Sequence, residues 1–251
     1  MTEKQVLLSA PGEPFTQHLD RVVDEWERVS SRFQATLPRL FAGTSWDEIE
    51  EAIRRMLLLH DLGKATDKWQ KFISEQKDEP DNETERKKGA PHAQLGGAYL
   101  WWAYDPKDDL VMASAFAIAI HHTDSALARV GVEDPATLLV ISGLINEAND
   151  KIRWHEGLDE FVCWLKDKHD LGLPKHPKDT DVYTVSEFAL ALREWARGDT
   201  ILALHRKRLQ VAALHSVIKV CDIRAAFKRP GSQEPEKETF NHTILYGGLL
   251  P

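Results

Sequence analysis

Hydrophobic residues along most of this chain recur every three or four positions, which is the spacing of one face of an α-helix. In the segment that begins at Phe15, for example, Leu19, Val22 and Trp26 share such a face. Alternation with a period of two, which is typical of strands, is almost absent. The pattern therefore predicts an all-α protein with helices at residues 14–33, 46–60, 66–75, 92–103, 109–121, 135–148, 157–168, 185–197 and 200–227.

The segments between these helices differ sharply in composition. Residues 76–89 are charged and nearly free of apolar side chains, which predicts a loop. Residues 171–181 contain glycine and proline and predict a second loop, and 228–251 predict an irregular tail. No internal repeat occurs, and a length of 251 residues favours a single domain over 1–251.

The most informative short motif is His60-Asp61-Leu62-Gly63-Lys64, which follows the apolar helical run 53–59. Nitrogen and oxygen donors suit Mn²⁺, Fe²⁺, Co²⁺, Ni²⁺ or Zn²⁺, and a carboxylate can bridge two ions. We expect Gly63 to let the backbone turn tightly enough to aim Lys64 inward. Alone the motif is weak, because an Asp near a helix end is often a cap or turn residue.

Further histidines and one more aspartate lie at the ends or on the apolar faces of predicted helices. His18, for example, is three residues from Phe15 and four from Val22, so it points inward with them. Burying several such side chains without partners would be costly, so a shared metal centre accounts for them together. The candidate ligands are His18, His60, Asp61, His92, His121, His122 and Asp222.

Each candidate also has a simpler interpretation. His18 could be a core histidine with satisfied hydrogen bonds, and His92 could be an ordinary residue at a helix N-terminus. Asp222 could be a buried carboxylate paired with Arg224 or Lys219.

The adjacent His121 and His122 impose a condition on the backbone. Successive residues of a regular helix diverge by about 100°, so such a helix would not aim both imidazoles at one ion. The helix must therefore end or distort at this point, which the following Thr123-Asp124-Ser125 allows.

In this order, the motifs resemble those of HD-superfamily metal-dependent phosphohydrolases. More narrowly, the chain is similar to the HD nuclease of type I CRISPR systems, the partner or fused domain of the CRISPR helicase. The resemblance covers nearly the whole chain. It rests on His18, His60-Asp61-x-Gly63-Lys64-Ala65-Thr66, Trp69-Gln70, His92-x-x-Leu95-Gly96, His121-His122 and Asp222.

The resemblance implies an HD-domain helical bundle with a centre for two divalent ions. These would be Mn²⁺, Co²⁺, Ni²⁺ or Fe²⁺, with Mg²⁺ or Zn²⁺ as alternatives. Asp61 suits the bridging position because a carboxylate offers two oxygens. Lys64 would bind substrate and neutralise charge that develops on the phosphoryl oxygens. The implied ligand sets are His18, His60, Asp61 and Asp222 for one ion, and Asp61, His92, His121 and His122 for the other.

The function implied is that of a metal-dependent nuclease. It would cut single-stranded DNA during CRISPR interference, as an endonuclease with exonuclease activity. A helicase, fused or separate, would supply the strand, and a CRISPR effector complex would recognise the target. No Gly-x-x-x-x-Gly-Lys-Ser/Thr loop occurs, so the chain itself is not the ATP-driven motor. The alternatives are a phosphohydrolase for small nucleotides or cyclic dinucleotides, and a docking module without catalysis.

Charge and composition limit where and how such an enzyme works. A net charge of −8 argues against a protein that coats DNA alone, because that affinity comes from Lys and Arg on phosphates. No apolar run is long enough for a membrane helix, and no secretory signal is evident. The two cysteines lack metal-site spacing, which favours a reducing, cytoplasmic setting without membrane contact.

A basic cluster and three tryptophans admit two readings each. The cluster His205-Arg206-Lys207-Arg208 could contact a phosphate backbone, although a solvated helix face is the more ordinary explanation. Trp69, Trp101 and Trp102 could stack on bases, although core packing is again more ordinary.

Overall fold

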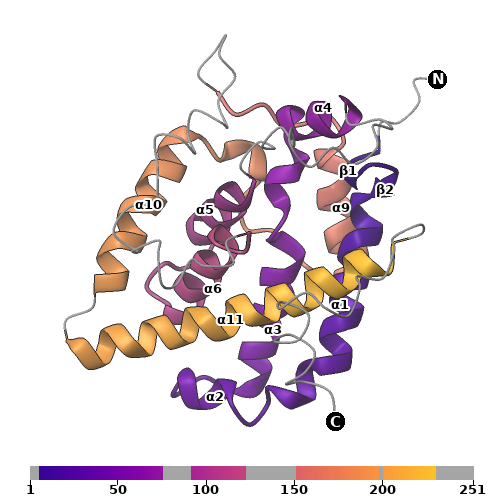
Figure 1. Ribbon diagram of the computed structural model, residues 1–251. Helices are drawn as coiled ribbons and strands as arrows, with labels where there is room; N and C mark the ends of the chain where they lie inside the picture. Colours follow the sequence, from indigo (N-terminus) through magenta and orange to yellow (C-terminus); the bar gives the residue numbers. More distant parts are fainter. Residues whose placement is uncertain (1–5, 76–91, 123–150, 198–199, 230–251) are drawn as a thin grey trace, which may run out of the picture.

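The computed structural model describes residues 6–75, 92–122, 151–197 and 200–229, and these residues form a helical bundle (Figure 1). A two-stranded antiparallel hairpin precedes the bundle. Its strands are β1 (Leu8–Ala10) and β2 (Glu13–Pro14). The α-helices are α1 (Phe15–Val29), α2 (Leu37–Leu40), α3 (Trp46–Leu59), α4 (Asp67–Glu75), α5 (Ala93–Ala103), α6 (Asp109–Ala119), α9 (Leu158–His169), α10 (Val182–Arg197) and α11 (Ile201–Phe227). The 3₁₀ helices are η1 (Ser30–Arg32), η2 (Leu62–Ala65) and η3 (Pro177–Asp179).

Eight of the nine predicted helices fall on described residues, and all eight are present with ends shifted by at most four residues. The predicted helix at 135–148, the loop at 76–89 and the tail from 230 onward lie outside the described residues. The hairpin, α2 and the 3₁₀ helices were not predicted. Segments of two to four residues are too short to display a hydrophobic period, so the pattern could not reveal them.

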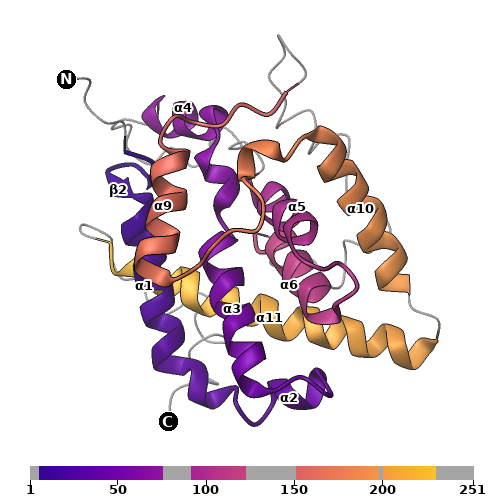
Figure 2. The ribbon, with the colours of Figure 1, turned by 180° about the vertical axis from the view of Figure 1, so that it is seen from behind.

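Two helices that are apolar on all sides form the centre of the bundle. Nearly every residue of α6 is buried, and α5 packs directly against it. A helix that is hydrophobic all round must be covered on every side. Around this pair, α3 and α11 contact α6, while α10 contacts α5 and α6, as Figures 1 and 2 show from opposite sides.

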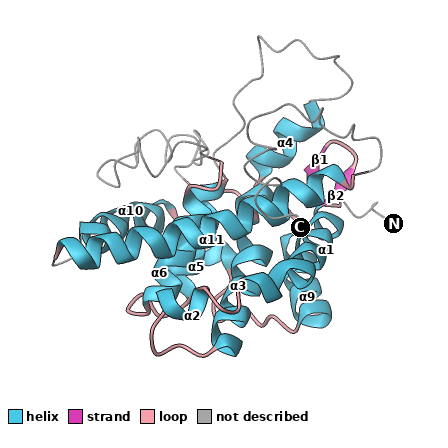
Figure 3. Ribbon diagram, turned by 60° about the horizontal axis from the view of Figure 1, so that its bottom comes forward, coloured by secondary structure: helices cyan, strands magenta, loops and turns pink. Residues whose placement is uncertain are grey.

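The longest helix, α11, connects the two halves of the bundle. Figure 3 shows α11 extending across the molecule, and it contacts both α1 and α6. Thr200 caps its N-terminus by accepting a hydrogen bond from the backbone N–H of Ala203 at 3.1 Å. Asp222 lies near the other end, where α11 meets α1. None of the described helices is long and apolar enough to cross a membrane.

Helix α3 brings the His60-Asp61 motif into the middle of the bundle. Its N-terminus carries a capping box, in which the Ser45 hydroxyl accepts a hydrogen bond from the Glu48 backbone N–H and the Glu48 carboxylate accepts one from the Ser45 backbone N–H. The last turn of α3 is buried, and α3 ends at Leu59, so His60 is its C-cap residue. The helix therefore ends among apolar neighbours rather than at the surface.

The close packing of α5 on α6 generates a stability prediction. A Cβ at Gly97 would lie 2.6 Å from the backbone oxygen of Ala115, so Gly97→Ala must push the two helices apart. We expect a loss of about 1–3 kcal/mol in the free energy of unfolding, measured by urea denaturation. Gly172→Ala is the matched control, because its Cβ would meet only Lys166 Cδ, at 3.8 Å. Equal stability of the two variants would contradict the packing.

Candidate metal centre

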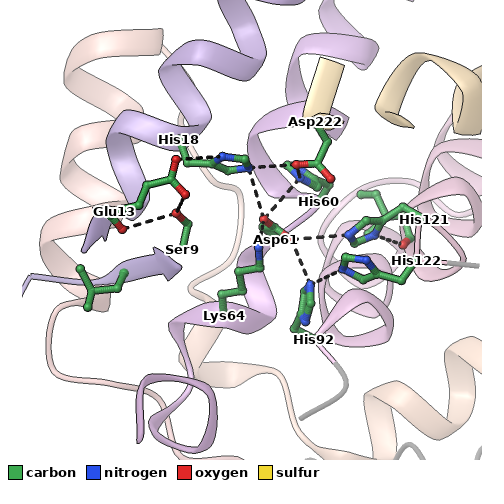
Figure 4. Close-up of polar contacts among 12 residues, drawn as sticks. Ser9, Glu13, His18, His60, Asp61, Lys64, His92, His121, His122 and Asp222 are labelled. Carbon is green, nitrogen blue, oxygen red and sulfur yellow. Dashed lines mark hydrogen bonds and ion pairs between the residues drawn. The ribbon is translucent and has the colours of Figure 1, made fainter. Parts of the chain in front are cut away.

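The structure brings all seven predicted ligands together in the middle of the bundle (Figure 4). They come from α1, the C-cap of α3, the N-cap of α5, the segment after α6, and α11. Their nitrogen and oxygen atoms form two groups, and within each group they lie within 4.8 Å of one another. We name them the first ligand group (His18, His60, Asp61 and Asp222) and the second ligand group (Asp61, His92, His121 and His122).

Asp61 belongs to both groups and presents a different oxygen to each. Its Oδ2 atom lies 3.6 Å from Nε2 of His18 and 3.4 Å from Nε2 of His60. Its Oδ1 atom lies 3.1 Å from Nε2 of His92 and 3.5 Å from Nε2 of His121. The carboxylate is 1% exposed. This arrangement is the one that a bridging carboxylate requires.

Backbone carbonyls orient two of the histidines. His60 Nδ1 lies 2.6 Å from the oxygen of Leu57, and His121 Nδ1 lies 2.7 Å from the oxygen of Ile118. A carbonyl oxygen can only accept, so each Nδ1 carries the proton and donates. Each Nε2 therefore keeps its lone pair and faces the centre, as a metal ligand must.

The two adjacent histidines reach the centre because α6 has ended. The helix stops at Ala119, so the expected departure from regular helix is confirmed. His121 is buried, whereas His122 is the exposed member of the second ligand group. His122 Nε2 lies 2.7 Å from Nε2 of His92. The second ligand group therefore has one side open to solvent.

Asp222 faces the histidines of the first ligand group. Its Oδ1 atom lies 3.1 Å from Nε2 of His18 and 3.8 Å from Nε2 of His60, and its side chain is 22% exposed. Arg224, which offered an alternative pairing, instead lies 3.8 Å from Glu25. This geometry favours the ligand interpretation of Asp222.

Lys64 is nearly buried, and its ammonium lies 2.6 Å from Asp61 Oδ2. Gln70 holds this turn in place by donating to the backbone oxygens of Lys64 and Leu8, at 2.7 and 2.9 Å. Gly63 lies in the tight turn of η2, which aims Lys64 inward as expected, and its φ is not positive. Glycine is needed here for close approach, since a Cβ would lie 2.3 Å from the backbone oxygen of His92.

Charges inside the centre compensate for burial. Burial raises the pKa of Asp61, but His60 and Lys64 outweigh it and hold the pKa well below its usual value. Burial likewise raises the pKa of Asp222, but contacts with His18 and His60 hold it well below that value. Both carboxylates are therefore ionised at neutral pH, as metal ligands must be.

The histidines of the two groups respond in opposite directions. Burial lowers the pKa of His18, but its contacts with Asp222 and Glu13 outweigh burial and raise the pKa to about 9. In the second ligand group, burial lowers the pKa of His92 to about 4 and, with the neighbouring His121, that of His122 to about 2. His92 and His122 are therefore unprotonated at neutral pH.

One buried acid beside the centre was not predictable from the sequence. Glu13, on β2, lies with its Oε1 atom 3.6 Å from His18 Nδ1. Its Oε2 atom accepts a hydrogen bond from Ser9 Oγ at 2.5 Å and contacts Arg229 at 2.8 Å. Burial raises its pKa, but His18 and Ser9 outweigh burial and lower the pKa to about 2. The hairpin that places Glu13 there is too short for a pattern to predict.

The donor set fits divalent metal ions. Among the residues that the structure describes, the buried Nε2 atoms of His18, His60 and His121 have no hydrogen-bond partner. Unsatisfied buried polar atoms are costly, and here they converge on carboxylate oxygens. Imidazole nitrogens with carboxylates suit first-row transition metals.

The other singled-out residues have structural surroundings. Trp69 packs edge-on against His92, with ring centroids 4.4 Å apart, and Trp101 packs against Phe188. Lys175 lies over the ring of Trp102 at 4.1 Å. In the basic cluster 205–208, Arg206 donates to the backbone oxygen of Leu40 and Lys207 to that of Trp195. The tryptophans therefore fit a packing role better than base stacking. The basic cluster lies largely on an exposed helix face, as its simpler interpretation predicts.

A helical bundle with these paired His-Asp clusters defines the HD class. The family profile described as "Cas3, HD domain" matches residues 14–203, which is more than half of the chain. The chain therefore belongs to the Cas3 HD domain family. The match includes six of the seven candidate ligands, and Asp222 lies beyond it.

Individual relatives agree with this family. A "CRISPR-associated endonuclease Cas3-HD" from Pyrococcus furiosus is 26% identical over 239 residues, covering 88% of this chain and 91% of the relative. One with the same description from Methanocaldococcus jannaschii is 21% identical over 238 residues, covering 90% of each. The predicted family is thereby confirmed, and the predicted enzyme class agrees with the description of these relatives as endonucleases.

A solved structure confirms the predicted fold. The CRISPR-associated Cas3 HD domain protein from Methanocaldococcus jannaschii superposes with a TM-score of 0.59 at 17% sequence identity. The superposition covers 85% of this chain and 99% of that one. The all-α HD bundle predicted from the sequence is therefore the fold of this chain.

The raised pKa of His18 predicts a pH dependence of the chelator-treated protein. Its folded pKa of about 9 lies above the usual 6.5, so protonation stabilises the fold fully below pH 6.5. We expect this contribution, up to about 3 kcal/mol, to be lost as the pH rises through 9. His92 and His122 have lowered pKa values, so they change the pH dependence of stability only below pH 6.5 and not between pH 6.5 and pH 9.

The measurement is urea unfolding in EDTA at pH 6.5 and pH 9. His18→Gln serves as the control, because it removes the titrating group while keeping a polar side chain of similar size. The loss of stability between the two pH values should be smaller in this variant. Identical losses in both proteins would show that His18 does not carry the effect.

Proposed function

We propose that this chain is a metal-dependent nuclease that cuts single-stranded DNA during CRISPR interference. The observation that carries the proposal is the pair of ligand groups that share Asp61. Adjacent divalent ions supply an activated water and neutralise charge on a phosphate during its displacement. Buried His and Asp donors, with one group open to solvent at His122, provide a place for such a reaction.

The chain's own residues have distinct tasks in this proposal. Asp61 belongs to both ligand groups and presents one oxygen to each, so it sets their relative position. Lys64 places a buried ammonium beside the centre, where it stabilises negative charge that develops on the phosphoryl oxygens. Asp61 and Lys64 are thus the proposed catalytic residues, Lys64 also contacts substrate, and the seven ligands are His18, His60, Asp61, His92, His121, His122 and Asp222.

The proposal extends to cofactors and partners. The ions are two transition-metal ions, Mn²⁺, Co²⁺, Ni²⁺ or Fe²⁺, which the imidazole-rich donor set favours over Mg²⁺. A helicase, fused or separate, supplies unwound DNA, and a CRISPR effector complex selects the target. Residues 1–251 act as one HD domain. The setting is the cytoplasm, consistent with Cys163 and Cys221 both being free thiols.

The net charge of −8 shapes the expected substrate. The 40 Asp and Glu residues outnumber the 32 Lys and Arg residues, so the surface outside the centre attracts phosphates weakly and little binding energy is available to deform a duplex. A flexible single strand reaches a centre set among helices more easily. The proposed enzyme therefore depends on a partner to open the duplex.

The substrate experiment compares circular single-stranded DNA with relaxed duplex DNA at equal nucleotide concentration. We expect the chain to cut the circular strand with Mn²⁺, Co²⁺ or Ni²⁺ and largely to spare the duplex. EDTA and Asp61→Ala should each abolish cutting, because both remove the bridged pair of ions. Activity confined to mononucleotides or cyclic dinucleotides would favour the small-nucleotide phosphohydrolase instead. If the metal-loaded protein hydrolyses none of these substrates, the chain is not an enzyme of either kind, and the hypothesis of a docking module without catalysis is favoured.

Lys64→Ala tests the proposed catalytic cation. We expect cleavage to slow by about 10²-fold, the scale of one preorganised transition-state donor. Metal content measured by atomic emission should match the parent protein, because an ammonium is not a ligand. Lys64→Arg is the control that keeps a positive charge and should retain more activity. Loss of metal in Lys64→Ala would mean that Lys64 supports the site structurally.

A further inference from the structure

Glu13 is a buried carboxylate that faces a candidate ligand from behind. The residue is 3% exposed, and Figure 4 shows it on the side of His18 opposite to Asp61 and Asp222. His18 presents Nδ1 to Glu13 Oε1 at 3.6 Å and Nε2 to Asp222 Oδ1 at 3.1 Å. The imidazole therefore lies between an outer carboxylate and the centre.

The position of an imidazole proton decides whether it can bind a metal. A neutral imidazole has one N–H and one lone pair, and an acceptor beside Nδ1 keeps the proton there. For His60 and His121 this acceptor is a backbone carbonyl within their own turn. For His18 the group facing Nδ1 is the Glu13 carboxylate, which at 3.6 Å acts as an ion-pair partner rather than as a hydrogen-bond acceptor. An anion in this place also makes the opposite nitrogen a stronger donor.

Glu13 is itself fixed by groups from separate parts of the chain. Ser9 Oγ from β1 donates to it at 2.5 Å, and Arg21 from α1 pairs with it. Arg229, two residues beyond the end of α11, lies 2.8 Å from its Oε2 atom. Glu13 therefore connects α1, which carries His18, with the end of α11, which carries Asp222.

We propose that Glu13 is a positioning residue that orients His18 and thereby supports the first ligand group but not the second. The proposal rests on the proposed metal centre. No contact of Glu13 with a histidine of the second group is found among the described residues. Removing its charge should therefore weaken one ion and spare the other.

The chain offers a matched control at Glu25. This carboxylate is fully buried on α1 and pairs with Lys228 at 2.5 Å and with Arg224 on α11 at 3.8 Å. It therefore also joins α1 to the end of α11 by ion pairs, but its ion-pair partners among the described residues, Arg28, Arg224 and Lys228, are not ligands. Like Glu13→Gln, Glu25→Gln removes one buried negative charge that links α1 to the end of α11.

The experiment measures Mn²⁺ binding to the full chain by calorimetry and by electron paramagnetic resonance. The parent should bind two ions that give a spin-coupled signal. In Glu13→Gln we expect one ion to bind about 10–100-fold more weakly, the scale for an outer-shell partner, while the other keeps its affinity. At limiting Mn²⁺ the coupled signal should give way to that of a single ion. Glu25→Gln should keep both ions.

Two further variants make the result specific. His18→Gln should weaken the same ion, and adding Glu13→Gln to it should cause little further loss, because the two act through one interaction. Glu13→Asp keeps the charge on a shorter side chain and should weaken the same ion if Glu13→Gln fails to fold. Unchanged affinity in a folded Glu13 variant, or equal losses in Glu25→Gln, would overturn this inference. A parent protein that binds no Mn²⁺ would instead overturn the metal centre itself.

Discussion

The buried carboxylate of Asp61 is the constraint on which the rest of this structure depends. A negative charge that is 1% exposed would be prohibitively costly alone, and its surroundings are arranged to compensate it. Lys64 supplies a direct counter-charge, and histidines approach both oxygens. Helix α3 must end in the bundle interior for this to occur, and the close approach of Gly63 to His92 follows from the same requirement.

Long amphipathic or fully apolar helices were predictable because each carries its period over many residues. Their ends moved by a few residues, as at α10, which begins at Val182 rather than at 185. The candidate ligands were also predictable, since a polar residue that interrupts an apolar helix stands out. The position of Asp222 illustrates this, because it lies among buried residues of α11 and now faces His18.

Features that arise from tertiary contacts alone could not be predicted. Glu13 sits in a two-residue strand, and only the folded arrangement places it behind His18. The close approach of Gly63 to His92 was not predictable for the same reason, because His92 is remote in sequence. The opposite pKa shifts of His18 and His92 likewise depend on which carboxylates surround each ring rather than on the residues beside them in the chain.

The ligands enter the centre in an order that matters while the protein is being made. A nascent chain completes its N-terminal helices first, and α11 leaves the ribosome after every other described helix. The second ligand group is complete once His122 has been added, whereas the first ligand group waits for Asp222. Because metal binding contributes its free energy only to a formed site, the pair of ions cannot assemble on an unfinished chain. Synthesis order thus delays the completion of the proposed nuclease centre until the bundle that contains it has closed.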